Sequence, residues 1–243
     1  MKLGIMQPYF LPYIGYWQLL NAVDQYVIFD DVHYINRGWI NRNRILTGGN
    51  PAYLNLPVRG ASQNKRINEI EINHDKRLFD KALRTVELAY KRAPFYSSAY
   101  PLLCEIMGSK EQYLSGFIGE SLKLICGYLG IHTELYLSSA LEKDDTLKGQ
   151  EKILDICMRM KASEYYNAIG GQKLYSAGRF HEKGVLLKFL RTNAYAYRQF
   201  DNEFQKDLSI LDVMMFNSVD EIKAMLENYT LITGSDMTED VND

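Results

Sequence analysis

Short apolar segments alternate with helix-like segments in both halves of this chain, and that alternation limits the possible folds more than any other feature. Two amphipathic stretches, residues 14–25 and 149–161, have the spacing of helices, while the apolar segments are typical of short buried strands at residues 3–6, 26–31, 132–138, 163–169 and 184–190. Strands that alternate with helices form a largely parallel sheet with helices on its faces. The sequence therefore predicts an α/β fold with a mostly parallel sheet.

Three consecutive helical stretches interrupt the alternation near the middle of the chain. They are predicted at residues 75–92, 98–108 and 111–129. We predict that residues 75–130 form a helical insertion or subdomain within a single α/β domain over residues 1–230. The acidic, polar end of the chain, residues 231–243, is predicted to be a flexible tail.

The charge balance gives no reason to expect a nucleic-acid or membrane partner. The chain has 28 basic and 30 acidic side chains and a formal net charge of −2, so no overall field attracts polyanions. No apolar run approaches the length of a membrane span, and residues 1–20 lack the shape of a signal peptide. We therefore expect a cytoplasmic protein without membrane insertion. Its three cysteines are widely spaced among apolar residues and are expected to be buried free thiols.

In such sheets ligands gather beyond the carboxyl ends of the strands, so the loops after residues 6, 31, 137 and 168 are the places to search. The first of these loops has the sequence QPYFLPYIGY, in which two prolines stiffen the backbone and Gly15 permits a close approach where a helix begins. The start of a helix also suits phosphate. We predict that Gln7, Tyr9 and Gly15 line a nucleotide pocket. The alternative is a rigid, packed junction whose aromatic side chains belong to the core.

The second loop is rich in arginine and asparagine. The segment of residues 33–44 follows a strand end and contains Trp39 together with the candidate binding residues Arg37, Asn41, Arg42, Asn43 and Arg44. Arginine matches phosphate or carboxylate in bidentate fashion. If the segment is extended, the two arginines at its end share one face and the two asparagines share the other, so one pair contacts a ligand and the other orients the loop. We predict that this segment and residues 7–15 face one pocket. An ordinary solvated basic loop, or a nucleic-acid contact, is the alternative.

Three residues near the second strand end are candidates for catalysis. Asp30 and Asp31 end the strand, and His33 could act as an acid or a base, although a lone histidine is more often a simple hydrogen-bonding residue. Adjacent carboxylates on a strand face opposite ways, so at most one of them holds magnesium, and we assign that role to Asp31. The sequence contains no zinc-binding pattern, and no haem or flavin is expected.

The second half of the chain adds three weaker candidates for phosphate binding. Gly170 and Gly171 lie between a strand and a helix start, but they match no established phosphate-loop pattern, and backbone flexibility explains them equally well. Lys148 lies in the loop after the strand at residues 132–138, where a charged helix start is the alternative.

Several blocks of the sequence resemble the WbqC-like proteins. They are MQPYFLPYIGYWQL, VIFDDVHYINRGWINRNRI, LPV, AYKRAPFY, YYNAIGGQKLY and LSILDVMMFN, in the same order, from about residue 3 to residue 220. The chain has His33 where we expect glutamine in many members. The first loop also resembles that of nucleotidylyltransferases, but it lacks their two histidines, so this likeness extends to the fold at best.

The resemblance implies a function in the biosynthesis of bacterial surface polysaccharide of the O-antigen or lipopolysaccharide type. It implies a transferase or ATP-dependent ligase that attaches an amino acid such as glycine to an amino sugar through an amide bond. The substrate would be a nucleotide-linked sugar, with ATP and magnesium as the cofactors. The alternative in the same pathway is a non-catalytic protein that binds a nucleotide-sugar or a partner enzyme.

Overall fold

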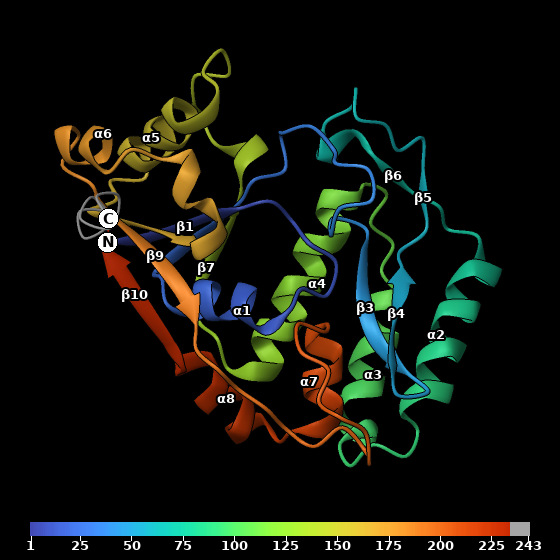
Figure 1. The fold of residues 1–243 in the computed structure, drawn as a ribbon. Helices are drawn as coiled ribbons and strands as arrows, with labels where there is room; N and C mark the ends of the chain where they lie inside the picture. The colour runs from blue at the N-terminus through green and yellow to red at the C-terminus, as the bar shows by residue number, and fades with distance from the viewer. Residues whose placement is uncertain (234–243) are drawn as a thin grey trace.

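A computed structural model describes residues 1–233, and the strands at its centre form one sheet in the order β10-β9-β8-β1-β2-β7 (Figure 1). The strands are β1 (Lys2–Met6), β2 (Gln25–Ile28), β7 (Glu134–Leu137), β8 (Glu164–Ala168), β9 (Leu186–Thr192) and β10 (Tyr229–Thr233). All neighbours pair in parallel except β10, which is antiparallel to β9. The predicted α/β fold with a mostly parallel sheet is confirmed.

The central strands are short apolar runs because helices cover both of their faces. On one face Leu3 and Ile5 pack with buried side chains of α5 (Gly149–Arg159) and α6 (Ala177–Glu182). On the other face Tyr26 packs with α1 (Ile14–Asn21) and α8 (Val219–Glu227). The register of β1 with β2, in which Ile5 lies beside Val27, keeps each face uniformly apolar.

The segment between β2 and β7 forms a second layer beside the sheet (Figure 1). Its helices α2 (Lys76–Tyr90), α3 (Tyr96–Met107) and α4 (Leu114–Leu129) occupy the stretches predicted to be helical, and α7 (Ile210–Phe216) packs against α3. Two hairpins precede these helices. They pair β3 (Arg42–Thr47) with β4 (Asn50–Asn55), and β5 (Val58–Arg59) with β6 (Glu71–Ile72). The end of the arginine-rich segment, treated as a loop in the prediction, supplies the first strand of a hairpin.

The chain reverses its direction across the sheet at β1. It passes from β1 to β2 and β7 on one side and then returns to β8, β9 and β10 on the other side. The loops after β1 and β8 consequently diverge, and in open α/β sheets this is where ligands bind. The described residues also contain the 3-10 turns η1 (Ile67–Glu69), η2 (Ser138–Ala140) and η3 (Ile169–Leu174). The turn η2 directly follows β7, and η3 directly follows β8.

The described part of the chain ends in a strand. The last strand reaches Thr233, so the first residues of the predicted tail are in β10, while the rest of that tail lies outside the described residues. None of the helices in residues 1–233 combines the length and the apolar character needed to cross a membrane.

Cys126 and Cys157 are buried free thiols, and burial raises the pKa of each to about 12. Cys104 is a half-buried free thiol.

Candidate functional site

A cavity of about 410 Å³ opens between the loop after β1 and the start of the β3–β4 hairpin. It is lined by Tyr9, Tyr13, Trp39, Asn43, Arg44 and Asp207. Both segments that were predicted to face one pocket, residues 7–15 and 33–44, therefore contribute to its wall. We call it the aromatic cavity, because three of its lining side chains are aromatic.

The loop after β1 is held rigidly by side chains from distant segments. Asn43 donates from Nδ2 to the carbonyl oxygens of Phe10 (3.1 Å) and Leu11 (3.0 Å). Ser209, at the start of α7, donates to the same carbonyl of Leu11 at 2.7 Å. Leu11 has a φ of +44°, a conformation that costs free energy for a bulky residue and persists only when its surroundings fix it. The loop is thus preformed, and Tyr9 and Tyr13 are presented on either side of the fixed segment.

Gly15 is packed behind the cavity and is not one of its lining residues. A Cβ atom at this position would lie 2.5 Å from Cε2 of Tyr13 and 2.7 Å from Oγ1 of Thr192. The side chains of Tyr13 and Thr192 therefore fill the space that Gly15 leaves open, and this contact positions the Tyr13 ring. Gln7 is half-buried, and its backbone carbonyl accepts from the hydroxyl of Tyr16 at 3.2 Å. Ligand contacts by Gln7 and Gly15 stay predictions.

Arg44 carries the positive charge of the aromatic cavity. Its Nη2 donates to the carbonyl oxygen of Asp207 at 3.2 Å, and its guanidinium lies 5.6 Å from the centre of the Trp39 ring. Its Nε is buried and has no hydrogen-bond partner within residues 1–233. A buried donor without a partner is costly, so a ligand oxygen that reached this nitrogen would satisfy it.

Arg42 is on the same strand but is used within the protein. It donates to the carbonyl oxygens of Gly38 (3.1 Å) and Arg37, and its guanidinium lies 4.2 Å from the centre of the Tyr53 ring. Arg37 is exposed, with a φ of +59°. These contacts brace the turn that leads into β3.

Asn41, just before β3, and Asn43, within it, orient the segment, which is the role we expected for one of the two pairs. In addition to the Asn43 contacts above, Asn41 accepts from the hydroxyl of Tyr34 at 2.7 Å and donates to the carbonyl of Leu56 at 3.2 Å. Asn43 nevertheless also lines the aromatic cavity. Ligand contacts by either asparagine stay predictions.

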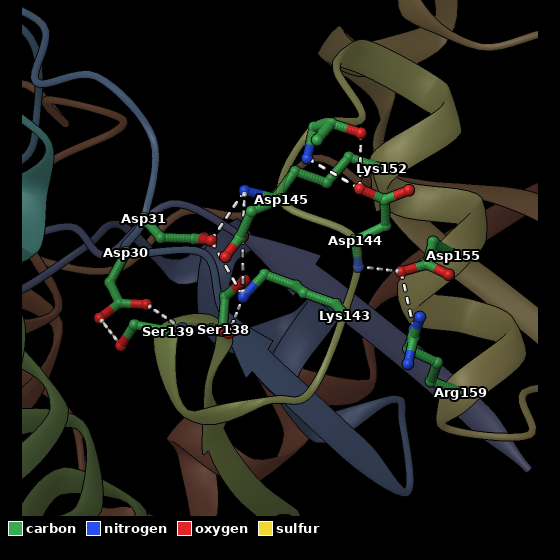
Figure 2. A network of polar contacts seen from close by, with 11 residues as sticks. Asp30, Asp31, Ser138, Ser139, Lys143, Asp144, Asp145, Lys152, Asp155 and Arg159 are labelled. Atoms are coloured by element: carbon green, nitrogen blue, oxygen red, sulfur yellow. Dashed lines mark hydrogen bonds and ion pairs between the residues drawn. The ribbon is translucent and has the colours of Figure 1, made fainter.

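A second polar group lies at the carboxyl ends of β2 and β7 (Figure 2). Asp30 is fully buried, and its two carboxylate oxygens accept from the backbone N–H of Ser139 (2.9 Å) and from the Ser139 hydroxyl (2.7 Å). This pair of hydrogen bonds joins the two strand ends. Asp30 thus has a structural role, and its proposed part in catalysis stays a prediction.

Asp31 faces a pair of buried lysines. Its Oδ2 accepts from Nζ of Lys152 at 2.7 Å and lies 3.0 Å from Nζ of Lys143. Burial acts to raise the pKa of Asp31, but the nearby donor groups of Lys152, Ser138 and Lys143 outweigh burial, and the pKa is lowered. Within residues 1–233 no group of three or more histidine, cysteine or acidic side chains could hold a metal ion. Magnesium at Asp31 would compete with two ammonium groups, so these residues fit a metal poorly and that assignment stays a prediction.

The remaining predicted residues lie around the same edge of the sheet. His33 is exposed, and its backbone forms a bridge with Arg66. Lys148 is exposed immediately before α5. Gly170 and Gly171 lie in η3, directly after β8. A Cβ at Gly171 would lie 2.8 Å from the Asn167 side chain, whereas a Cβ at Gly170 would meet nothing within 4 Å. Their roles in binding stay predictions.

Several residues of these two sites were not among the predicted site residues. Tyr13 and Trp39 lie within the two segments that had been selected, so their position in the sequence was a usable signal. Asp207 reaches the aromatic cavity from a segment just before α7 and carries no local signal. Lys143 and Lys152 could have been inferred only from the need of a buried Asp31 for a cationic partner.

The hollow continues along the carboxyl end of β9. A second cavity of about 370 Å³ shares Asp207 with the aromatic cavity and is otherwise lined by Thr192, Asn193, Ala194, Tyr195, Phe204 and Lys206.

Burial raises the pKa of Tyr13, with smaller contributions from Tyr9 and Asp207. Tyr13 therefore stays a neutral hydrogen-bonding group at physiological pH.

Comparison with known proteins places this geometry in a family. The family model of the WbqC-like protein family matches residues 7–224, which include both loops and the aromatic cavity. The chain belongs to the WbqC-like family. Membership of the WbqC-like family implies a role in polysaccharide biosynthesis.

A relative of the chain is a protein described as uncharacterized. The chain is 30% identical over 220 residues to the uncharacterized protein Rv1507c of Mycobacterium tuberculosis, and the alignment covers 89% of this chain and 93% of that protein. No solved structure matches the chain significantly. The likeness to nucleotidylyltransferases therefore stays a prediction.

Proposed function

We propose that this WbqC-like protein is an enzyme of surface-polysaccharide biosynthesis that joins an amino acid such as glycine to the amino group of a nucleotide-linked amino sugar. Membership of the WbqC-like family supports a function in polysaccharide biosynthesis. The observation that carries the rest is the aromatic cavity, in which Arg44 has a buried and unpaired donor among aromatic side chains.

The chemistry of the aromatic cavity suits such a ligand. Tyr9, Tyr13 and Trp39 provide apolar ring faces for a sugar or a base, and Arg44 can hold a phosphate oxygen. The exposed Asp207 can accept from a hydroxyl or ammonium group of the sugar. A volume of about 410 Å³ lies within the range of roughly 300–1,000 Å³ that small-molecule sites occupy.

Amide formation needs an activated carboxyl group, and ATP is the proposed source of activation. A carboxylate oxygen of the amino acid attacks a phosphorus of ATP, which forms a mixed anhydride and releases ADP or pyrophosphate. The sugar amine then attacks the carbonyl carbon and loses a proton, the C–N bond forms, and phosphate or AMP leaves with the broken C–O bond. This sequence requires positioning and charge stabilisation without a protein nucleophile.

The direct test is turnover with labelled substrate. The purified protein is incubated with a panel of nucleotide-linked amino sugars, isotopically labelled glycine and ATP, and the products are analysed by mass spectrometry. The proposal expects an ATP-dependent mass gain of one glycyl residue on the sugar, and loss of that product in Arg44→Ala. Arg84→Ala is the matched control, because Arg84 forms only an exposed ion pair with Glu87 on α2.

The same experiment separates the enzyme from its alternative. A non-catalytic protein of the pathway would use the same aromatic cavity and the same arginine. It would be stabilised against heat by a nucleotide-linked sugar and would form no product under any condition. If no amino sugar gave either a product or a thermal shift, both functions would be wrong.

A further inference from the structure

Lys143 and Lys152, which we call the lysine pair, carry more buried charge than their carboxylate partner neutralises. Only 2% of the Lys143 side chain and 9% of the Lys152 side chain are exposed, and both contact the single carboxylate of Asp31. Asp30 points the other way, toward Ser139 (Figure 2). Two ammonium groups against one carboxylate leave one uncompensated positive charge, and lysine is rarely buried without full pairing.

Asp145 supplies the missing negative charge, but only loosely. Its Oδ1 lies 3.7 Å from Nζ of Lys143 and 3.8 Å from Nζ of Lys152, which is beyond hydrogen-bonding distance for both. Its side chain is 60% exposed. Asp145 therefore lies between the lysine pair and the solvent, and it compensates their charge without the hydrogen bonds that the ammonium groups can make.

The backbone on both sides of Asp145 is fixed, which leaves its side chain as the part that can move. Asp144 accepts from the backbone N–H of Thr146 at 2.9 Å, and its own N–H donates to Asp155 on α5 at 3.0 Å. Lys143 also donates to the carbonyl oxygen of Ser138. Rotation of the Asp145 side chain would move its carboxylate away from the lysine pair without any change in the backbone of the loop.

The surroundings of the lysine pair hold two further polar atoms with unused hydrogen-bonding capacity. Ser138 lies close enough to lower the pKa of Asp31, yet its buried hydroxyl makes no hydrogen bond of good geometry within residues 1–233. Oδ1 of Asp31 is also buried without a partner in that part of the chain. Buried polar atoms are normally paired, so both atoms can take part in a further hydrogen bond at this place.

We propose that the lysine pair is a binding site for an oxyanion of a ligand, and that Asp145 is an internal anion which the ligand displaces. Two ammonium groups and the Ser138 hydroxyl would then surround the oxyanion at the carboxyl ends of β2 and β7, where ligands of such sheets bind. A phosphate and a carboxylate have the same chemistry here. The site does not depend on the proposed reaction, because anion binding is measured without turnover.

The test is a titration with bare anions in a buffer that contains no other oxyanion. Inorganic phosphate and acetate are titrated separately by calorimetry into the wild-type protein and into Asp145→Asn. We expect one of the two anions to bind, and the anion that binds shows whether the oxyanion of the ligand is a phosphate or a carboxylate. Removal of the competing charge in Asp145→Asn should tighten that binding about fivefold, the scale of one charge interaction at 4 Å in water. Glu142→Gln, an exposed carboxylate in the same loop, is the matched control and should bind like the wild type.

Substitution of one lysine of the pair is the complementary experiment. Lys152→Gln should weaken anion binding at least about tenfold, since a hydrogen bond to a charged group is removed. If this variant unfolds because Asp31 loses its partner, the double variant Asp31→Asn/Lys152→Gln restores the charge balance and should also bind weakly. Unchanged or weaker binding in folded Asp145→Asn, or wild-type affinity in a lysine variant, would overturn the proposal, as would no binding of either anion.

Discussion

The side-chain amide of Asn43 donates at 3.0 Å to the carbonyl oxygen of Leu11, the residue with a φ of +44° at the centre of the loop after β1. This contact joins the two segments that line the aromatic cavity. The contact and the stiff residues of the loop act together. Prolines limit the conformations of the loop, and a buried asparagine from β3 fixes the one that presents Tyr9 and Tyr13.

Asn43→Ala is therefore expected to destabilise the protein. The substitution leaves the carbonyl oxygen of buried Phe10 without its Asn43 donor, while Leu11 keeps the donor from Ser209, and this costs about 1–3 kcal/mol of the free energy of unfolding. Urea unfolding measures the change. Asn36→Ala, at an exposed position of the same segment, should change the stability little. Equal stability of the two variants would show that the contact does not hold the loop.

Arg44→Ala and Arg42→Ala are expected to differ. Arg44→Ala should weaken the binding of a nucleotide-linked sugar by roughly 1.5–3 kcal/mol, the scale of a hydrogen bond to a charged group, with little change in melting temperature. Arg42→Ala should mainly lower the melting temperature, because Arg42 braces the turn at Arg37 and Gly38. Calorimetry and thermal unfolding on the same samples check both. The reverse pattern would place the ligand on the other arginine.

Gly15→Val is expected to damage both the fold and the aromatic cavity. Its Cβ would meet Cε2 of Tyr13 at 2.5 Å and Oγ1 of Thr192 at 2.7 Å, so the Tyr13 ring must move. Overpacking of this kind costs about 1–3 kcal/mol, and the displaced ring should weaken ligand binding as well. Gly127→Ala is the control, since a Cβ there, in the last turn of α4, meets nothing within 4 Å. A folded Gly15→Val variant with normal ligand affinity would mean that the loop is only a packed corner.

The buried carboxylate of Asp212 predicts a pH dependence of stability. It accepts from the hydroxyls of Tyr90 and Tyr197 and from Nε2 of Gln199, each at 2.7 Å, yet burial outweighs these bonds and raises its pKa above 3.8. A carboxyl group whose pKa is higher in the folded state stabilises the protein below its unfolded pKa, and this contribution is lost as the pH rises through the folded pKa.

Comparison with a variant that does not titrate isolates this effect. The difference in unfolding free energy between the wild type and Asp212→Asn should be most favourable to the wild type at about pH 4 and should shrink toward about pH 7. Urea unfolding at a series of pH values measures it. A difference that grows with pH would show that the pKa of Asp212 is lowered in the folded protein.

The sheet could be predicted from the sequence because its strands are buried on both faces and are therefore continuous apolar runs, as in LGIM of β1. The strand β3 could not, because its sequence RNRILT begins with polar residues. Asn43 is buried there only because it bonds to carbonyl oxygens of the loop after β1. Such a contact depends on the tertiary structure and leaves no periodic pattern.

The candidate site was predictable to a similar degree. Strand ends in an α/β sheet indicated the segments that hold Tyr9 and Arg44, and the structure brings these segments together. Local sequence could not distinguish Arg42 from Arg44, since their difference lies in the carbonyl groups that each one meets. Asp207 and the lysine pair come from segments that approach the site only in the folded chain.

The most direct measurement is a crystal structure of the protein with a nucleotide-linked amino sugar. The account predicts that the ligand occupies the aromatic cavity between Tyr9, Tyr13 and Trp39, with an oxygen of its phosphate bonded to the Nε of Arg44. A ligand bound elsewhere, with the aromatic cavity empty and Arg44 unchanged, would contradict it.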